Sequence, residues 1–352
     1  MNSREKLLEQ LGIAHPIVQA PMAGVSTPQL AAAVTNSGAL GSLGIGASTA
    51  AQAREMIEQT QALTPGPFNV NVFCHQPARR DSSLEADWVQ YLAPLFAEAG
   101  IEPPDSLNEI YTSFIEDDET LEVLLELKPA VVSFHFGIPS AECIAAFQGA
   151  GVYTMATATC MGEATEIEAA GIDAIVAQGI EAGGHRGIFH PEAADEGLST
   201  LALVRLLSRQ TTLPIIAAGG IMDGFAMKAA LASGAAAVQL GTAFVLCPES
   251  AANEAYRAAL KSERASETRL TKVLSGRPAR GIVNRLISFG ETKQSPPPAD
   301  YPIAYDATKR LNAAASKHGN HEFAAQWAGQ GAPLARELPA ADLIAVILEE
   351  SV

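Results

Sequence analysis

Residues 174–187, AIVAQGIEAGGHRG, join an apolar run to a glycine-rich turn that is followed by a histidine and an arginine. The apolar, β-branched start predicts a buried strand before the glycines. Gly183 and Gly184 would let a ligand approach the backbone closely, whereas His185 can titrate near neutral pH and Arg186 keeps its charge. The segment therefore predicts the carboxyl end of a strand that opens onto a functional site. A glycine-rich turn capped by a solvated His-Arg pair is the alternative.

On both sides of this segment, short apolar runs alternate with alanine-rich helical patterns. The runs with strand character span residues 16–22, 40–46, 68–74, 130–137, 151–158, 174–178, 214–218 and 237–241. The helical patterns span residues 27–37, 49–59, 118–127, 140–149, 162–170, 199–208, 223–233 and 250–261. Eight alternating units predict parallel strands with crossover helices, and so an α/β fold of the (β/α)8 TIM-barrel type. A doubly wound sheet is the alternative that the pattern leaves open.

Two stretches interrupt the alternation. Residues 75–117 form a long insertion after the third predicted strand, and the residues from 262 onward form a C-terminal extension that is divided by a Pro-Pro-Pro run at 296–298. Insertions of this size in a compact fold commonly cover a site. We therefore expect residues 1–261 to form the barrel, including the insertion, and residues 262–352 to form an extension that covers the site and contributes substrate-site residues.

The composition argues against several classes of protein. The 352 residues include 39 acidic and 23 basic side chains, and the resulting net charge of −16 disfavours binding to nucleic acid. Cys74, Cys143, Cys160 and Cys247 show no C-x-x-C spacing, so neither a metal site nor a disulfide framework is expected. The sequence has no apolar signal segment and no run long enough to cross a bilayer. We expect a cytoplasmic protein with no membrane partner.

Glycines and polar residues follow the ends of the predicted strands, where a barrel of this kind carries its site. Gly24 follows the first strand, and Asn71 faces inward on the third, where a buried amide needs a polar partner. His135 ends the fourth strand, and a single histidine there is more often structural than catalytic. Gly220 and Gly241-Thr242 follow the seventh and eighth strands, a position that commonly binds phosphate in eight-stranded barrels. The pattern therefore predicts a phosphorylated ligand.

Five ordered motifs carry a resemblance to a known family: QAPMAG at 19–24, NVN at 69–71, QGIEAGGHRG at 178–187, AGG at 218–220 and QLGT at 239–242. Together they resemble the nitronate monooxygenases, formerly called 2-nitropropane dioxygenases, from about residue 12 to the C-terminus. The resemblance implies an FMN-dependent TIM barrel with the phosphate near Gly220 and Gly241-Thr242. The residues that it implies around the flavin are Met22, Gly24, Asn71, Gln178, Gly183, Gly220, Gln239, Gly241 and Thr242.

The C-terminal part narrows the resemblance. YPIAYDATK at 301–309 and QWAGQG at 326–331 resemble signatures of the bacterial class I enzymes. If the chain is helical from residue 302, Tyr301, Tyr305 and Lys309 lie along one side of that helix. The resemblance adds Tyr111 and Tyr256 to this polar wall beside His185. The candidate substrate-binding residues are therefore Tyr111, His135, Tyr256, Tyr301, Tyr305 and Lys309.

The resemblance implies oxidation of alkyl nitronates, with propionate 3-nitronate as the expected substrate. FMN and O2 would convert it to a carbonyl compound with nitrite and nitrate, which is a detoxifying reaction. His185 is the candidate catalytic residue, either as a base for neutral nitroalkanes or as a hydrogen-bond donor to the nitronate. We favour binding and electrostatic stabilisation, because a substrate that is already deprotonated needs no base. Arg186 is expected to brace the loop.

Three other interpretations remain at this point. A flavin-dependent enoyl reductase would need a nicotinamide site and a groove for an acyl chain. A barrel of the inosine monophosphate dehydrogenase type would need a nucleophilic cysteine, for which Cys160 is a weak candidate. The third is a flavin-binding barrel without activity. The expected partners are a small anionic substrate and O2, and the expected state is a monomer or a homodimer.

Overall fold

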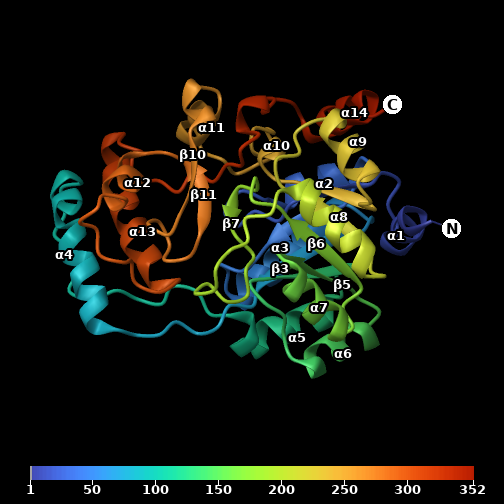
Figure 1. Cartoon of the computed structure of the whole chain (residues 1–352), viewed down its shortest axis with the longest axis horizontal. Helices are drawn as coiled ribbons and strands as arrows, with labels where there is room; N and C mark the ends of the chain where they lie inside the picture. The colour runs from blue at the N-terminus through green and yellow to red at the C-terminus, as the bar shows by residue number, and fades with distance from the viewer. Residues whose placement is uncertain (1) are drawn as a thin grey trace.

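The computed structural model describes residues 2–352, in which eight parallel strands form a barrel surrounded by helices (Figure 1). The barrel strands are β1 (Ile17–Gln19), β2 (Gly41–Gly44), β3 (Phe68–Phe73), β4 (Val131–His135), β5 (Tyr153–Ala158), β6 (Ala174–Gln178), β8 (Ile215–Ala218) and β9 (Ala237–Leu240). They pair in the order β1-β9-β8-β6-β5-β4-β3-β2, and a parallel bridge between Val18 and Leu40 joins the two end strands. The predicted TIM barrel is confirmed, and the doubly wound sheet is excluded.

Helices cover the outside of the barrel, and their termini follow local signals in the sequence. At the start of α2, Thr27 accepts a hydrogen bond from Leu30 N–H, and Pro28 occupies the first turn. α6 ends at Gly149, as the sequence predicted, and Gly151 takes the left-handed conformation at φ 77° just after this end. The first nine helices are α1 (Ser3–Leu11), α2 (Pro28–Asn36), α3 (Ala50–Leu63), α4 (Ser82–Glu98), α5 (Asp118–Leu127), α6 (Ala141–Gly149), α7 (Met161–Ala169), α8 (Thr200–Gln210) and α9 (Gly224–Ala232).

The remaining helices are α10 (Thr242–Val245), α11 (Glu254–Leu260), α12 (Arg285–Gly290), α13 (Ile303–Ala315) and α14 (Ala340–Glu350). Short 3-10 turns span Phe114–Glu116, Glu263–Ser266, Ser316–His318 and Ala332–Leu334. Within residues 2–352, no helix is both long and apolar enough to cross a bilayer.

The last helix of the chain completes the ring around the barrel. The pattern at residues 250–261 does form a helix, α11, but its Tyr256 and Leu260 pack in a cluster separate from the main core. α14 instead contacts both α9 and α2, and its Leu343 and Ile347 belong to the main core. Figure 1 shows α14 beside α9. The long segment between α10 and α14 is therefore an excursion out of the ring.

The insertion and the extension pack against each other. α4, for which the sequence analysis assigned no helix, contacts α13, and Trp88, Phe96 and Leu311 share a second core. The extension also supplies β10 (Thr268–Thr271) and β11 (Ala279–Ile282). β11 pairs antiparallel with β10 on one side and with β7 (Gly184–His185) on the other, in a three-stranded sheet. This sheet joins the extension directly to the loop that carries His185.

The opposite end of the barrel is closed by apolar side chains. Leu7 and Leu11 of α1 are buried with Val131, Ala174 and other residues from the first positions of barrel strands. The cavity of the protein therefore lies at the other end of the barrel, where the strands terminate.

Candidate active site

A cavity of about 940 Å³ opens at the carboxyl ends of the barrel strands. Its volume lies toward the upper end of the range for sites that enclose cofactors and small ligands. Every residue proposed from the sequence for the site lines this cavity: Met22, Gly24, Asn71, Tyr111, His135, Gln178, Gly183, His185, Gly220, Gln239, Gly241, Thr242, Tyr256, Tyr301, Tyr305 and Lys309. Residues that are up to 287 positions apart, Met22 and Lys309, therefore share one space.

The backbone of His185 is fixed from two sides. On one side β7 pairs with β11, with His185 opposite Ala279. On the other side the carbonyl oxygen of His185 accepts a hydrogen bond from Gln178 Nε2 at 3.0 Å and lies 3.2 Å from His135 Nε2. Because a barrel strand and an extension strand both hold this residue, its ring projects into the cavity from a defined position.

The ring of His185 is neutral at physiological pH. Its Nε2 lies 2.9 Å from Ser275 Oγ, whose single hydrogen can be donated either to this nitrogen or to the carbonyl oxygen of Arg277 at 3.2 Å. The first choice places the ring hydrogen of His185 on Nδ1, and the second allows it on Nε2. Burial lowers the pKa of His185 to about 3, with smaller contributions from the nearby His135, Arg277 and His75. A base this weak cannot readily remove a proton from a neutral nitroalkane near pH 7.

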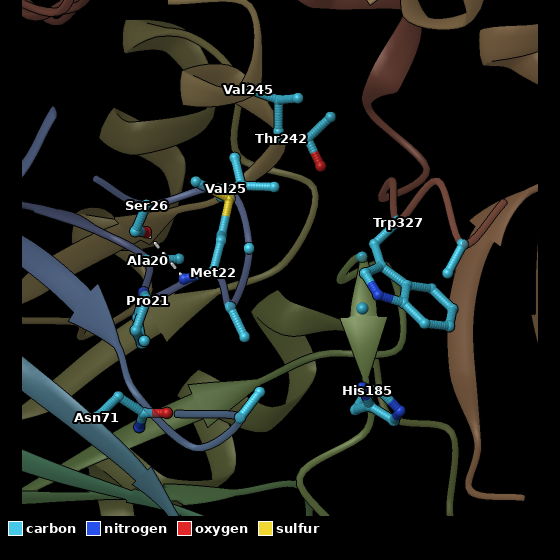
Figure 2. A pocket seen from close by; sticks show the side chains of 18 of the residues that line it. Ala20, Pro21, Met22, Val25, Ser26, Asn71, His185, Thr242, Val245 and Trp327 are labelled. Carbon is cyan, nitrogen blue, oxygen red and sulfur yellow. Dashed lines mark hydrogen bonds between the residues drawn. The ribbon is translucent and has the colours of Figure 1, made fainter. Parts of the chain in front are cut away.

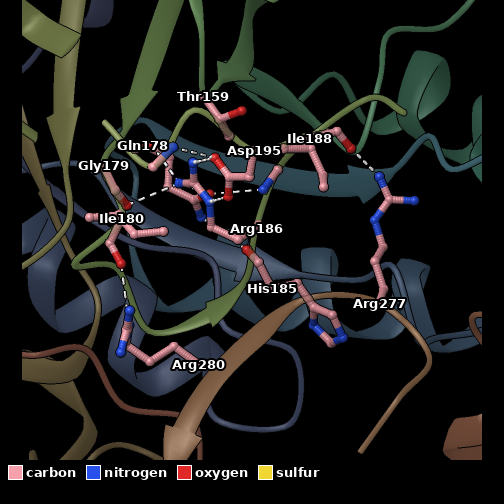
Figure 3. Close-up of polar contacts among 12 residues, drawn as sticks. Thr159, Gln178, Gly179, Ile180, His185, Arg186, Ile188, Asp195, Arg277 and Arg280 are labelled. Carbon is pink, nitrogen blue, oxygen red and sulfur yellow. Dashed lines mark hydrogen bonds and ion pairs between the residues drawn. The ribbon is translucent and has the colours of Figure 1, made fainter. Parts of the chain in front are cut away.

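Arg186 lies behind the loop and does not face the cavity. Its side chain is 1% exposed, and it forms an ion pair with Asp195 at 2.8 Å. It also donates to the carbonyl oxygens of Gln178 and Gly179 at 2.8 and 3.1 Å, as Figure 3 shows. The guanidinium thus satisfies backbone acceptors that the sharp turn after β6 leaves free. The expected bracing role agrees with these contacts.

Aromatic rings and one lysine form the wall supplied by the insertion and the extension. Tyr111 and Tyr305 pack edge to face with centroids 6.0 Å apart, and Lys309 Nζ lies 4.9 Å from the centre of the Tyr111 ring. Within residues 2–352, no carboxylate forms an ion pair with Lys309. Desolvation raises the pKa of Tyr305 to about 12, so its hydroxyl stays protonated. The wall therefore offers an ammonium and a phenol to an anion.

Glycines allow the extension to close tightly over the cavity. A Cβ on Gly183 would lie 2.5 Å from Gly329 N, and a Cβ on Gly331 would lie 3.0 Å from the carbonyl oxygen of Gly220. Gly220 itself has a φ of 69°, in the left-handed region that favours glycine. Gly329 N–H donates to Thr242 Oγ1 at 3.0 Å. The backbone at the ends of β8 and β9 is thus left open for close approach.

Asn71 is the buried amide whose partner the sequence left open. Its Nδ2 donates to Ser133 O at 3.0 Å and to Ser133 Oγ at 2.9 Å. Its oxygen points toward the cavity in Figure 2, where Met22 and Trp327 lie on opposite sides of the opening. One half of the amide is held by a neighbouring strand, and the other half remains available to a ligand.

Several residues around the cavity escaped the sequence analysis. Ser275, Arg277 and His75 lie behind His185, in segments without a glycine-rich turn or an alternating pattern that would single them out. Trp327 was noticed only as part of a closing motif, yet its ring centroid lies 5.0 Å from that of His185. The hydroxyl of Tyr256 donates to the carbonyl oxygen of Trp327 and so holds that motif in place.

Cys160 does not support the alternative that requires a nucleophilic thiol. It is the N-cap residue of α7 and is absent from the residues that line the cavity. Burial raises its pKa, which disfavours the reactive thiolate.

A parallel barrel that opens glycine-rich strand ends into one large cavity is the architecture of a TIM-barrel enzyme. Comparison with known proteins then gives the family: the family model described as nitronate monooxygenase matches residues 4–350. The chain belongs to the nitronate monooxygenase family.

Individual relatives agree with this assignment. The nitronate monooxygenase of Pseudomonas aeruginosa is 57% identical over 98% of this chain and 99% of its own length. The nitronate monooxygenase of Paraburkholderia phytofirmans is also 57% identical, over 99% of this chain and 95% of its own. Among solved structures, nitroalkane oxidase from Streptomyces ansochromogenes superimposes with a TM-score of 0.91 at 42% identity, covering 98% of this chain and 97% of that one. FabK from Thermotoga maritima gives 0.74 at 29% identity, with 98% and 95% covered.

Proposed function

We propose that this protein oxidises alkyl nitronates, with propionate 3-nitronate as substrate, FMN as cofactor and O2 as co-substrate. The products would be a carbonyl compound with nitrite and nitrate. The observation that carries the proposal is that His185 and Lys309, which forms no ion pair within residues 2–352, line one cavity in a member of the nitronate monooxygenase family. This combination suits a substrate that arrives as an anion.

The residues at the strand ends fit FMN. A phosphate needs backbone N–H groups that it can approach closely, and the chain offers Gly220, with its positive φ, and Gly241, whose absent Cβ leaves room beside Ala20 and Met22. The free amide oxygen of Asn71 and the side of Met22 would meet the ring system. When bound, FMN would supply the redox chemistry of the reaction.

The protein's own groups would bind and orient the nitronate. Lys309 and the hydroxyl of Tyr305 would hold the carboxylate of propionate 3-nitronate by charge-assisted hydrogen bonds. The neutral ring of His185 would donate a hydrogen bond to the nitronate oxygens if Nδ1 carries the hydrogen, with Ser275 serving as donor to Nε2. Trp327 and the tyrosine rings would exclude water from this end of the cavity.

The test is oxygen consumption by the purified protein. Propionate 3-nitronate should support rapid consumption with release of nitrite, and 3-nitropropionate at equal concentration should support little, because His185 is a poor base. The purified protein should also show the visible absorbance of a flavin. Bleaching of that absorbance by NADH without any reaction with nitronate would favour the reductase interpretation.

We propose that the insertion 75–117 acts together with the part of the extension 262–352 that precedes α14 as a cover over the site, because α4 and α13 share one core. The four cysteines are free thiols, which is consistent with a cytoplasmic location. A monomer or a homodimer is the proposed state.

A further inference from the structure

Arg277 is a buried cation that forms no ion pair within residues 2–352. Its side chain is 3% exposed, and within residues 2–352 no carboxylate lies within 4.0 Å of it. It donates to the carbonyl oxygen of Ile188 (Figure 3), while its Nε has no hydrogen-bond partner. Arg186, which is similarly buried, has Asp195 at 2.8 Å. An unpaired buried charge is costly, so the free protein holds at Arg277 a positive charge that an anion could compensate.

Arg277 lies behind His185, on the side away from the cavity. The carbon of its guanidinium is 4.2 Å from the centre of the Phe136 ring. The same ring packs edge to face on His185, with centroids 5.6 Å apart, so Phe136 lies between Arg277 and the site. Phe136 also contacts Tyr301 at 5.5 Å between centroids. Two residues before Arg277, Ser275 bonds to the His185 ring. One short segment, residues 275–277, therefore supplies both the hydrogen-bond partner of His185 and the nearby positive charge.

The residues next to Arg277 include an unusual backbone conformation and an unsatisfied buried histidine. Phe136 has a φ of 75°, in the left-handed region that a large side chain rarely adopts. His75, which has no exposed surface, packs edge to face on both Phe136 and Tyr301, and neither of its ring nitrogens has a partner. The ring that the guanidinium contacts is thus strained at its backbone, and its neighbour His75 is unsatisfied.

We propose that Arg277 is a positioning residue whose fixed charge makes the cavity prefer an ionised nitronate to the neutral nitro form of the same molecule. Its charge acts through Phe136 and His185 and needs no direct contact with the ligand. The titratable groups that face His185 are His135 from β4, Tyr301 and Tyr305 from the α13 region, and His75 and Arg277 themselves. None of them is a carboxylate. Burial lowers the pKa of Arg277, against a smaller opposite effect of the charge of Glu163. Glu163 forms no ion pair with Arg277 and instead accepts hydrogen bonds from the N–H groups of Thr159 and Phe189. This inference rests on the proposed function only for the identity of the anion.

The experiment compares binding of propionate 3-nitronate and 3-nitropropionate to the purified holoenzyme without oxygen. Both ligands carry the same carboxylate, so the contribution of Lys309 cancels in the ratio of their dissociation constants. Arg277→Met should lower the preference for the nitronate by about tenfold or more, the effect expected for a unit charge several ångströms away at the effective dielectric of a protein site. Arg277→Lys, which keeps the charge, should retain most of the preference.

Arg280→Met is the matched control. Arg280 lies three residues further along and is 7% exposed. Its side chain donates to the carbonyl oxygen of Ile180, away from the rings of His75, His135 and His185. Its replacement should leave the binding ratio unchanged. An unchanged ratio in Arg277→Met, or an equal loss in Arg277→Met and Arg277→Lys, would overturn the proposal.

A second measurement does not depend on nitronate as the ligand. Titration of the His185 ring nitrogens by NMR should show a pKa that is higher in Arg277→Met than in the natural protein and nearly unchanged in Arg277→Lys. If the natural protein fails to oxidise nitronate, the proposed function falls while this titration still tests Arg277. If Arg277→Met does not fold, a His185 pKa in a folded Arg277→Gln variant equal to that of the natural protein would refute the proposal, and a raised value would support it.

Discussion

Replacement of Gly183 by alanine should push the loop after β6 away from the extension segment at Ala328 and Gly329, which closes over it. The new Cβ would lie 2.5 Å from Gly329 N and 2.6 Å from the carbonyl carbon of Ala328, where ordinary contacts need at least about 3.4 Å. Both atoms are backbone, so no rotamer change relieves the clash, and the segment must retreat by about 1 Å. Overpacking of this kind costs about 1–3 kcal/mol. Displacement of Gly329 also weakens the hydrogen bond to Thr242, for a further cost of about 1 kcal/mol.

The expected total of about 2–4 kcal/mol should appear in two assays. Urea unfolding should show a lower free energy of unfolding, and flavin fluorescence should show an FMN affinity reduced by up to about a hundredfold. Gly149→Ala is the control, because Gly149 ends α6 and a Cβ there meets nothing within 4 Å. If Gly183→Ala matches the natural protein in both assays, the close packing of the two backbones does not hold the site together.

Three further predictions concern charge and protonation. Lys309→Met should raise the KM for propionate 3-nitronate about five- to thirtyfold, a loss of about 1–2 kcal/mol after discounting for solvent, with flavin content unchanged; an unaltered KM would remove Lys309 from the site. His185→Asn should cut kcat/KM while the protein stays yellow, and full activity would show that the ring does not bind substrate. The pKa values of His75 and His135 are lowered to about 4 and that of His185 to about 3, against an ordinary 6.5, so the unfolded state takes up protons first and Tm should fall from about pH 6.5 downward. His75→Phe should make that decline shallower, and an unchanged slope would contradict the assignment.

Much of the fold was predictable because the barrel repeats a local pattern. The run at 174–178 forms β6 with the predicted bounds, because a short apolar, β-branched segment that ends at glycines favours a buried strand over other secondary structure. The first strand is shorter than predicted and ends at Gln19, because the chain turns away at Ala20 and Pro21. The place of α14 in the ring could not be predicted, because its position depends on where a long excursion returns, and no local signal encodes that return.

The site shows the same division between local and distant information. Candidate residues on strand ends or in dense motifs, such as Gly220 and His185, could be identified from their neighbours in the sequence. Ser275 and Arg277 could not, since their importance comes from contacts with His185 and Phe136, which lie about 90 to 140 positions earlier. Burial and the absence of a partner are properties of the folded chain, so the unpaired charge of Arg277 becomes visible only in three dimensions.

The position of the closing segment in the chain has a consequence for biosynthesis. Residues 326–331 complete the cavity by bonding to Thr242 and Tyr256, yet they leave the ribosome after the whole barrel sheet has been made. A nascent chain thus exposes Met22, Asn71 and Gln178 with one wall missing. A chain that stops before residue 326 would therefore carry the strand ends of the site without the segment that encloses what they bind.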